Sequence, residues 1–222
     1  MTDALLVLFD VDGTLLLTHD EVYVDANRAA LAEVWGVSPD EADVPGDTAL
    51  AQTRRALRMI GIDDAEIDAG LPAWCASLSR RYVELLRDAD TSSWELAPGA
   101  KEALPLITRR ALLTGNPEAV ARARIERLGL AALFADGGGA FGCEREQRVD
   151  LFALARERAG DWPADRTVAV GDTPLDVAGA RAAGARCIAV ATGACGAHEL
   201  AAADVVIASL AELPAALERL AA

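Results

Sequence analysis

Short apolar runs that end at turns recur along this chain, and they constrain its fold more than any other feature. They span residues 5–9, 111–114, 167–171, 187–191 and 205–208, and helix-length segments separate the later ones. None alternates with polar residues, so each is expected to be buried on both faces, as a strand of a parallel sheet is. The pattern therefore predicts a doubly wound, Rossmann-like α/β fold, whose ligands bind beyond the carboxyl ends of the strands.

Residues 18–93 follow a different pattern. They contain no clear strand, and apolar residues recur at helical spacing, most clearly at Leu71, Trp74, Leu78 and Tyr82. Turn-rich segments bound the stretch on both sides. We expect a catalytic core made of residues 1–17 and 94–222, with residues 18–93 inserted as an α-helical cap.

The charge of the chain excludes several kinds of partner. Its 222 residues carry 35 acidic against 21 basic side chains, a formal net charge of -14. Nucleic acid and anionic membranes require a basic surface, so neither is an expected partner. An anionic substrate would bind only where a metal ion or a few arginines reverse the field inside one cleft.

The N-terminus and the cysteines bear on location. The apolar run of residues 4–9 is too short to span a membrane and has no basic segment before it, so we predict a cytoplasmic protein without a signal peptide. The four cysteines, at 75, 143, 187 and 195, form no C-x-x-C pair. We expect them to be free thiols, with neither a zinc site nor a disulfide framework.

Two carboxylates follow the first predicted strand. Asp10 and Asp12 are two residues apart in an extended segment, so both side chains can lie at the carboxyl end of that strand. Next to Mg²⁺ one carboxylate can remain an anionic nucleophile while the other exchanges protons. An ordinary Asp-Gly turn would account for Asp12 and Gly13, but for neither Asp10 nor Thr14.

Two later strands also end in polar residues. Thr114, Gly115 and Asn116 close the second apolar run, where the hydroxyl and nearby N–H groups can hold a phosphate, and Asn116 is expected to cap a helix beginning at Pro117. Asp172 ends a further strand, and Asp176 follows one helical turn later. Asp172 is therefore a candidate metal ligand, whereas Asp176 could serve only the helix dipole.

These segments together resemble the haloacid dehalogenase-like hydrolase superfamily, in its helical-cap, phosphoglycolate-phosphatase-like branch. Three of the four motifs of that family match, in the family's order and across the whole chain. The resemblance implies that Asp10 attacks phosphorus to form an aspartyl-phosphate and that Asp12 protonates the leaving group and then activates water. An aspartate at position 12 is typical of members that act on phosphate esters rather than on carbon–halogen bonds.

The resemblance also implies a magnesium site. Asp10, the backbone carbonyl of Asp12 and Asp172 correspond to the ligands, and Asp176 to an outer support. The remaining motif usually supplies a lysine, which residues 143–148 lack. Arginine keeps the charge and can clamp phosphate oxygens, so Arg148 is the preferred substitute and Arg145 the alternative.

Three further features receive no firm role. The glycine-rich segment 137–142 fits G-x-G-x-x-G but does not follow the first strand, so a dinucleotide site is rejected. The segment 45–48 resembles a substrate-specificity loop, although a helix start capped by Asp47 explains it equally well. His19 lies on the predicted hinge and is assigned no function.

The sequence thus predicts a Mg²⁺-dependent phosphatase that acts on a small phosphorylated metabolite, as a monomer or homodimer. The first alternative is a phosphomutase of the β-phosphoglucomutase type, although the cap loop and the flap lack the arginine and histidine typical of that branch. A non-catalytic binding relative is the third hypothesis, and the intact motifs disfavour it.

Overall fold

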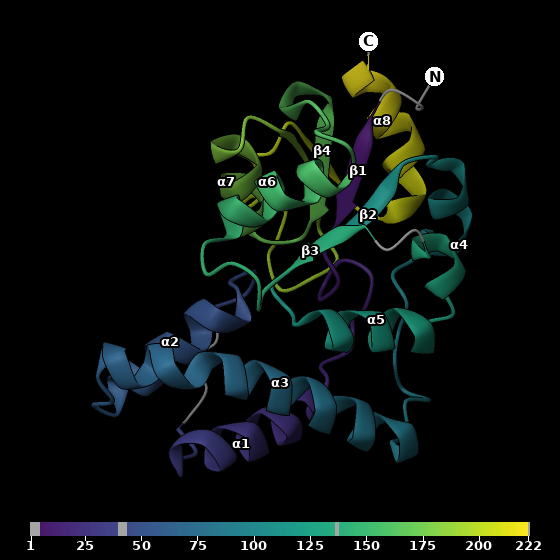
Figure 1. Cartoon of the computed structure of the whole chain (residues 1–222). Helices are drawn as coiled ribbons and strands as arrows, with labels where there is room; N and C mark the ends of the chain where they lie inside the picture. Colours follow the sequence, from purple (N-terminus) through teal and green to yellow (C-terminus); the bar gives the residue numbers. More distant parts are fainter. Residues whose placement is uncertain (1–4, 40–43, 136–137, 222) are drawn as a thin grey trace.

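A six-stranded parallel sheet forms the core of the computed structural model, which describes residues 5–39, 44–135 and 138–221 (Figure 1). The strand order is β3-β2-β1-β4-β5-β6, and every neighbouring pair is parallel. The predicted doubly wound α/β class is therefore confirmed. The strands are β1 (Leu6–Phe9), β2 (Arg110–Thr114), β3 (Gly139–Phe141), β4 (Thr167–Gly171), β5 (Arg186–Val190) and β6 (Val205–Ile207).

All five predicted strands are present, with ends that differ by at most one residue. The sixth, β3, was not predicted because its three residues, Gly139 to Phe141, begin within a glycine-rich segment that has little strand propensity. Gly138 and Gly139 precede no helix, which agrees with the rejection of a dinucleotide site there. Gly137, the first glycine of that motif, lies outside the described residues.

Helices cover both faces of the sheet, as continuous apolar strands require. On β1, Leu6 and Leu8 pack toward α6 (Arg148–Arg158) and α7 (Pro174–Ala182), whereas Val7 and Phe9 face α5 (Glu118–Arg127) and α8 (Leu213–Ala221). The short helix α4 (Ala100–Ala103) lies on the α8 side. Short 3-10 turns at Leu104–Leu106, Ala131–Phe134, Ala164–Arg166 and Leu210–Glu212 complete the connections. Within the described ranges, no helix is long and apolar enough to cross a lipid bilayer.

The predicted helical insertion leaves the core after β1 and returns before β2. It contains α1 (Glu21–Trp35), α2 (Ala49–Met59) and α3 (Asp64–Asp88), which share an apolar cluster around Trp74 and Leu78. Val120 of the core helix α5 joins this cluster, and Figure 1 shows α5 between the sheet and the cap. The core and cap are therefore packed on each other, while their division at residues 17/18 and 93/94 stays a prediction.

The prediction of four free cysteines is wrong for two of them. Cys75 of α3 and Cys143, just after β3, form a disulfide with 6.2 Å between their Cα atoms. The two cysteines are 68 positions apart, and their spacing in the sequence does not indicate a disulfide. The packing of the cap on the core brings them together. Cys187 and Cys195 are free, as predicted, the first buried and the second half-buried.

The start of α2 touches the core through main-chain atoms. Ala49 N–H donates to the carbonyl of Gly115 at 2.8 Å, and Leu50 N–H to that of Gly142 at 3.3 Å. A Cβ at position 115 would lie 2.1 Å from the Asp47 carbonyl oxygen, and one at position 142 would lie 1.6 Å from that of Gly115. Both positions therefore require glycine.

Candidate active site

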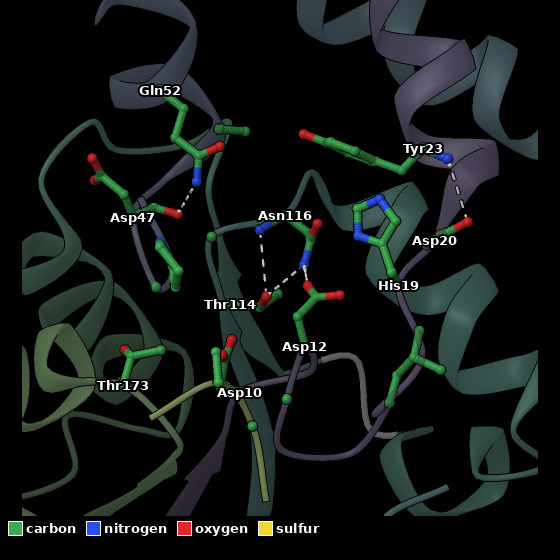
Figure 2. A pocket seen from close by; sticks show the side chains of 18 of the residues that line it. Asp10, Asp12, His19, Asp20, Tyr23, Asp47, Gln52, Thr114, Asn116 and Thr173 are labelled. Atoms are coloured by element: carbon green, nitrogen blue, oxygen red, sulfur yellow. Dashed lines mark hydrogen bonds between the residues drawn. The ribbon is translucent and has the colours of Figure 1, made fainter. Parts of the chain in front are cut away.

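The carboxyl ends of β1, β2 and β4 bring three of the predicted segments together. Because these strands are neighbours, Asp10, Thr114 and Asp172 meet at one edge of the sheet. A cavity of about 450 Å³ lies between this edge and the cap. Its walls include Asp10, Asp12, Thr114, Gly115, Asn116, Arg148 and Asp172 from the core, and Tyr23, Asn27, Ala49 and Gln52 from the cap (Figure 2).

Asp10 lies at the base of this cavity and is 5% exposed. Its Oδ1 is 3.5 Å from Nη2 of Arg148. Burial is the main cause of a carboxyl pKa well above its usual range, and Asp176 and Asp172 raise it further, against the opposing effect of Arg148. Without an added cation, Asp10 is therefore hard to ionise.

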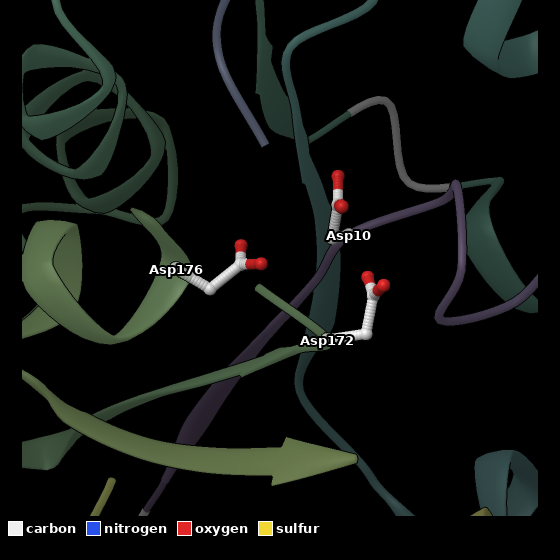
Figure 3. A group of neighbouring side chains, drawn as sticks. All are labelled: Asp10, Asp172 and Asp176. Carbon is white, nitrogen blue, oxygen red and sulfur yellow. The ribbon is translucent and has the colours of Figure 1, made fainter. Parts of the chain in front are cut away.

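Asp172 and Asp176 complete a buried acidic cluster with Asp10. One carboxylate oxygen from each residue lies within 4.8 Å of the other two (Figure 3). The hydroxyl of Thr14 donates to Asp172 at 3.0 Å. Burial, followed by the charge of Asp176, raises the pKa of Asp172 from an ordinary 3.8 to about 7.

Both carboxylate oxygens of Asp176 already accept hydrogen bonds. Its Oδ2 accepts from the backbone N–H and the hydroxyl of Thr173, at 3.0 and 2.6 Å, in a capping box that begins α7. Its Oδ1 accepts from Arg148. The carboxylates of Asp10 and Asp172 are the less occupied members of the cluster.

The cluster fits a hard divalent cation. Three carboxylates supply only oxygen ligands, which Mg²⁺ prefers, and a cation would relieve the repulsion that raises the pKa values of Asp10 and Asp172. Two glycines keep the space around Asp172 open: a Cβ at Gly13 would lie 2.1 Å, and one at Gly193 1.7 Å, from its Oδ2. The predicted contribution of the Asp12 carbonyl stays a prediction.

The side chain of Asp12 lies outside the acidic cluster. It is half exposed to the cavity and accepts from the Asn116 amide and from Nη1 of Arg124, with both carboxylate oxygens 2.8 Å from that nitrogen. In Figure 2 it faces Asn116 and Thr114 across the cavity floor. Its carboxylate is thus held from two sides yet open to a ligand.

Asn116 does not cap α5 as predicted. The helix begins at Glu118 after Pro117, without a side-chain cap. The amide of Asn116 instead donates to the Thr114 hydroxyl at 2.9 Å and to Asp12. The amide is thus directed toward a carboxylate that is distant in sequence and not toward the helix end. No local sequence pattern indicates this contact.

The structure brings Arg148, rather than Arg145, to Asp10. Arg148 is the first residue of α6 and is buried; it pairs with Asp176, and its Nη1 donates to the Gly46 carbonyl at 2.6 Å. These carboxylates raise its pKa in spite of its burial, so it stays charged. Arg145 is exposed and bonds only to a neighbouring carbonyl among the contacts of the described residues.

The segment 45–48 lies against the cavity, and its helix cap differs from the expectation. Thr48, not Asp47, caps α2: its hydroxyl accepts from Ala51 N–H at 3.1 Å. Asp47 is a wall residue that pairs with Arg55. His19 also lines the cavity, with an exposed side chain 3.8 Å from Glu21.

A second charged group was missed by the sequence analysis. Arg124 is 3% exposed and pairs with Asp12 and Asp20, and Tyr82 donates to Asp20 at 2.7 Å. One signal could have revealed it, because Arg124 shares the inward face of α5 with Val120 and Ala121. An arginine on an apolar helix face must have buried acidic partners.

Comparison with known proteins points to one family. A sequence profile described as haloacid dehalogenase-like hydrolase matches residues 5–184. A phosphoglycolate phosphatase of Rhodospirillum rubrum is 33% identical over 196 residues, 84% of this chain and 79% of the relative. One of Chromobacterium violaceum is 31% identical over 220 residues, 93% of each chain. The crystal structure of CbbY from Rhodobacter sphaeroides in complex with phosphate is 25% identical, with a TM-score of 0.70 over 96% of this chain and 98% of that one.

Proposed function

Because the chain belongs to the haloacid dehalogenase-like hydrolase family, we propose that it is a Mg²⁺-dependent phosphatase that hydrolyses a small phosphomonoester through an aspartyl-phosphate at Asp10. The observation that carries the proposal is the position of Asp10. It lies between a buried arginine and two further carboxylates, at the base of a cavity that reaches the cap. The matching family profile is described as that of a hydrolase, and the two relatives above from Rhodospirillum rubrum and Chromobacterium violaceum are phosphatases.

In the first step, an oxygen of Asp10 attacks phosphorus and the ester P–O bond breaks. Arg148 holds the Asp10 carboxylate and remains charged beside the incoming phosphoryl group. Thr114 and the nearby backbone N–H groups bind phosphoryl oxygens. A Mg²⁺ ion held by Asp10, Asp172 and the carbonyl of Asp12, with Asp176 in support, would neutralise charge on the phosphoryl oxygens.

Asp12 transfers the protons. It gives one to the leaving-group oxygen as the P–O bond breaks, and then takes one from the water that attacks the aspartyl-phosphate. Hydrolysis of that bond releases phosphate and restores Asp10. The half-exposed position of the Asp12 carboxylate on the cavity wall supports this role.

Phosphoglycolate is the first substrate to test. Two relatives that align over most of their length are phosphoglycolate phosphatases, and the CbbY structure contains phosphate. A cavity of about 450 Å³ suits a small phosphorylated metabolite. The cytoplasmic location and the oligomeric state stay predictions.

The test is phosphate release from phosphoglycolate, sugar phosphates, nucleotides and phosphoamino acids, with Mg²⁺ and with EDTA. We expect Mg²⁺-dependent turnover that Asp10→Asn abolishes and that Asp165→Asn, an exposed aspartate away from the cavity, leaves unchanged. Undiminished turnover in Asp10→Asn would refute the proposal. Transfer of phosphate between sugar positions, with little free phosphate, would indicate the phosphomutase alternative.

A further inference from the structure

Arg124 contacts both the active site and the cap through a single buried guanidinium. The side chain extends from α5, between the sheet and the cap, and is 3% exposed. A charged guanidinium at this depth is costly without acidic partners, and the charges of Asp12 and Asp20 raise its pKa against the effect of burial. The identity of these partners shows what the residue does.

The Nη1 atom of Arg124 faces the active site. It lies 2.8 Å from each carboxylate oxygen of Asp12 and 2.9 Å from Oδ1 of Asn116. Because Asn116 also donates to Asp12, two donors fix the direction of this carboxylate. The Asp12 side chain is half exposed and could be solvated by water, so its burial alone does not require the arginine.

The Nε atom of Arg124 faces the cap. It donates to Oδ2 of Asp20 at 2.8 Å, and the hydroxyl of Tyr82 donates to the same oxygen at 2.7 Å. Asp20 is the N-cap of α1 and accepts from the backbone N–H groups of Val22 and Tyr23. Tyr82 belongs to α3, so α1 and α3 of the cap both contribute to this network.

We propose that Arg124 is a positioning residue for Asp12, which it holds in place for proton transfer to the leaving group while Asp20 and Tyr82 fix the arginine to the cap. A cap displaced from its present position would pull Asp20 and Tyr82 away from Nε and release Arg124 from its fixed orientation. The placement of Asp12 thereby depends on the position of the cap. The inference rests on the proton-transfer role of Asp12 in the proposed function.

A comparison of two leaving groups tests this inference. p-Nitrophenolate leaves as a stable anion and needs little protonation, whereas an alkoxide needs a well-placed acid. The value of kcat/KM reports the first step, formation of the aspartyl-phosphate. It should be measured with p-nitrophenyl phosphate and with the best alkyl phosphate of the panel, for wild type, Arg124→Lys, Asp12→Asn and the double variant. Lysine keeps the positive charge but loses the planar fork.

We expect Arg124→Lys to lower kcat/KM about tenfold or more for the alkyl phosphate, and less than about threefold for p-nitrophenyl phosphate. In the Asp12→Asn background, the same substitution should change either rate by less than about twofold, because the two residues act as one unit. Arg122→Lys, on the same helix and paired with Glu118, is the matched control and should resemble wild type.

The inference is overturned by equal losses with both substrates, or by an undiminished effect of Arg124→Lys in the Asp12→Asn background. Either would assign the arginine a structural or phosphate-binding role. If Asp12→Asn itself keeps full activity on the alkyl phosphate, the proposed role of Asp12 fails and this inference with it. If Asp12→Asn loses activity on the alkyl phosphate but Arg124→Lys behaves as wild type, this inference fails while the proposed role of Asp12 stands.

A second variant covers the case in which Arg124→Lys does not fold. Tyr82→Phe keeps the arginine and the ring but removes the hydroxyl that binds Asp20. We expect kcat/KM to fall about threefold or more for the alkyl phosphate and to stay nearly unchanged for p-nitrophenyl phosphate. The ratio of kcat/KM for the alkyl phosphate to kcat/KM for p-nitrophenyl phosphate should fall in Tyr82→Phe. A ratio equal to that of the wild type would contradict the connection to the cap.

Discussion

The guanidinium of Arg148 lies between Asp10 and Asp176, with Nη2 3.5 Å from Oδ1 of Asp10 and bonded to Oδ1 of Asp176. One cation therefore serves the candidate nucleophile and the carboxylate of the capping box that begins α7. The same side chain also binds the Gly46 carbonyl of the cap. Arg148, which the sequence analysis prefers as the substitute for the lysine usual in this family, thus has several simultaneous partners.

Replacement of Arg148 by methionine should remove activity and weaken the fold. The change leaves two buried carboxylates without their cation, so we expect turnover to fall about 100-fold or more and stability to drop by about 3 kcal/mol. Arg148→Lys should retain measurable turnover because the charge remains. Phosphate release and urea unfolding measure the two effects. Arg145→Met is the control, and a larger loss there than at Arg148 would reverse the assignment.

The metal-free protein should become less stable as the pH rises from about 4 to about 7. The folded-state pKa of Asp172, about 7, lies above its ordinary value of 3.8, so the folded state binds this proton more tightly than the unfolded state does. The stabilising contribution is complete below pH 4 and is lost as pH rises through 7. Mg²⁺ binds the deprotonated form, so it should raise the melting temperature more at pH 8 than at pH 5.

The control for this prediction is Asp172→Asn, which removes the titrating carboxyl group. Melting temperatures with EDTA and with Mg²⁺ should depend less on pH in this variant. A stabilisation by Mg²⁺ that is as large at pH 5 as at pH 8 in the wild type would argue against the acidic cluster as its binding site.

Reduction of the Cys75–Cys143 disulfide should destabilise the chain. The bond closes a segment of 68 residues, for which the loss of unfolded-chain entropy corresponds to about 4 kcal/mol. We expect dithiothreitol to lower the free energy of unfolding by up to that amount, measured by urea denaturation. Cys75→Ser should show the same loss without reductant. Cys187→Ser, a free thiol, should leave the response to dithiothreitol intact, and no response in the wild type would contradict the prediction.

Gly13→Ala should impair metal binding as well as stability. Gly13 has φ +71°, and a Cβ there would lie 2.1 Å from Oδ2 of Asp172. Gly36 has nearly the same φ, +68°, with nothing within 4 Å of the added atom. Both alanine variants should lose about 1 kcal/mol to backbone strain. Only Gly13→Ala should also weaken Mg²⁺ binding, measured by calorimetry. Equal affinities in the two variants would show that Gly13 does not keep the space beside Asp172 open for the ion.

The sequence predicts those parts of the fold and site that depend on local pattern. Continuous apolar runs are sufficient to locate the parallel strands, and parallel strand ends meet at one edge, so Asp10, Thr114 and Asp172 could be placed together in advance. The short strand β3 was not predicted because it begins at a glycine, which has low strand propensity, and it contains no apolar run of sufficient length. The limit in this case is the weakness of a three-residue signal.

Contacts between the cap and the core could not be predicted in the same way. The Cys75–Cys143 pair and the Arg124 network join residues far apart in sequence, and their partners depend on how α3 packs against α5. The role of Asn116 changed for the same reason: its amide N–H donates to Asp12, and its Oδ1, the acceptor that a helix cap would use, accepts from Arg124 instead. Tertiary packing decided each of these points.

The main-chain contacts of Asp47 and Ala49 with Gly115, and of Leu50 with Gly142, limit how near the cap can come to the sheet. Main-chain atoms are already in contact there, and a shorter approach would require overlapping backbones. The closest spacing of the cap and the sheet at this contact is therefore fixed by peptide groups, independent of which side chains line the cavity. Substitutions on the cavity wall can change which molecule is preferred, while the nearest approach of the cap to the sheet stays the same.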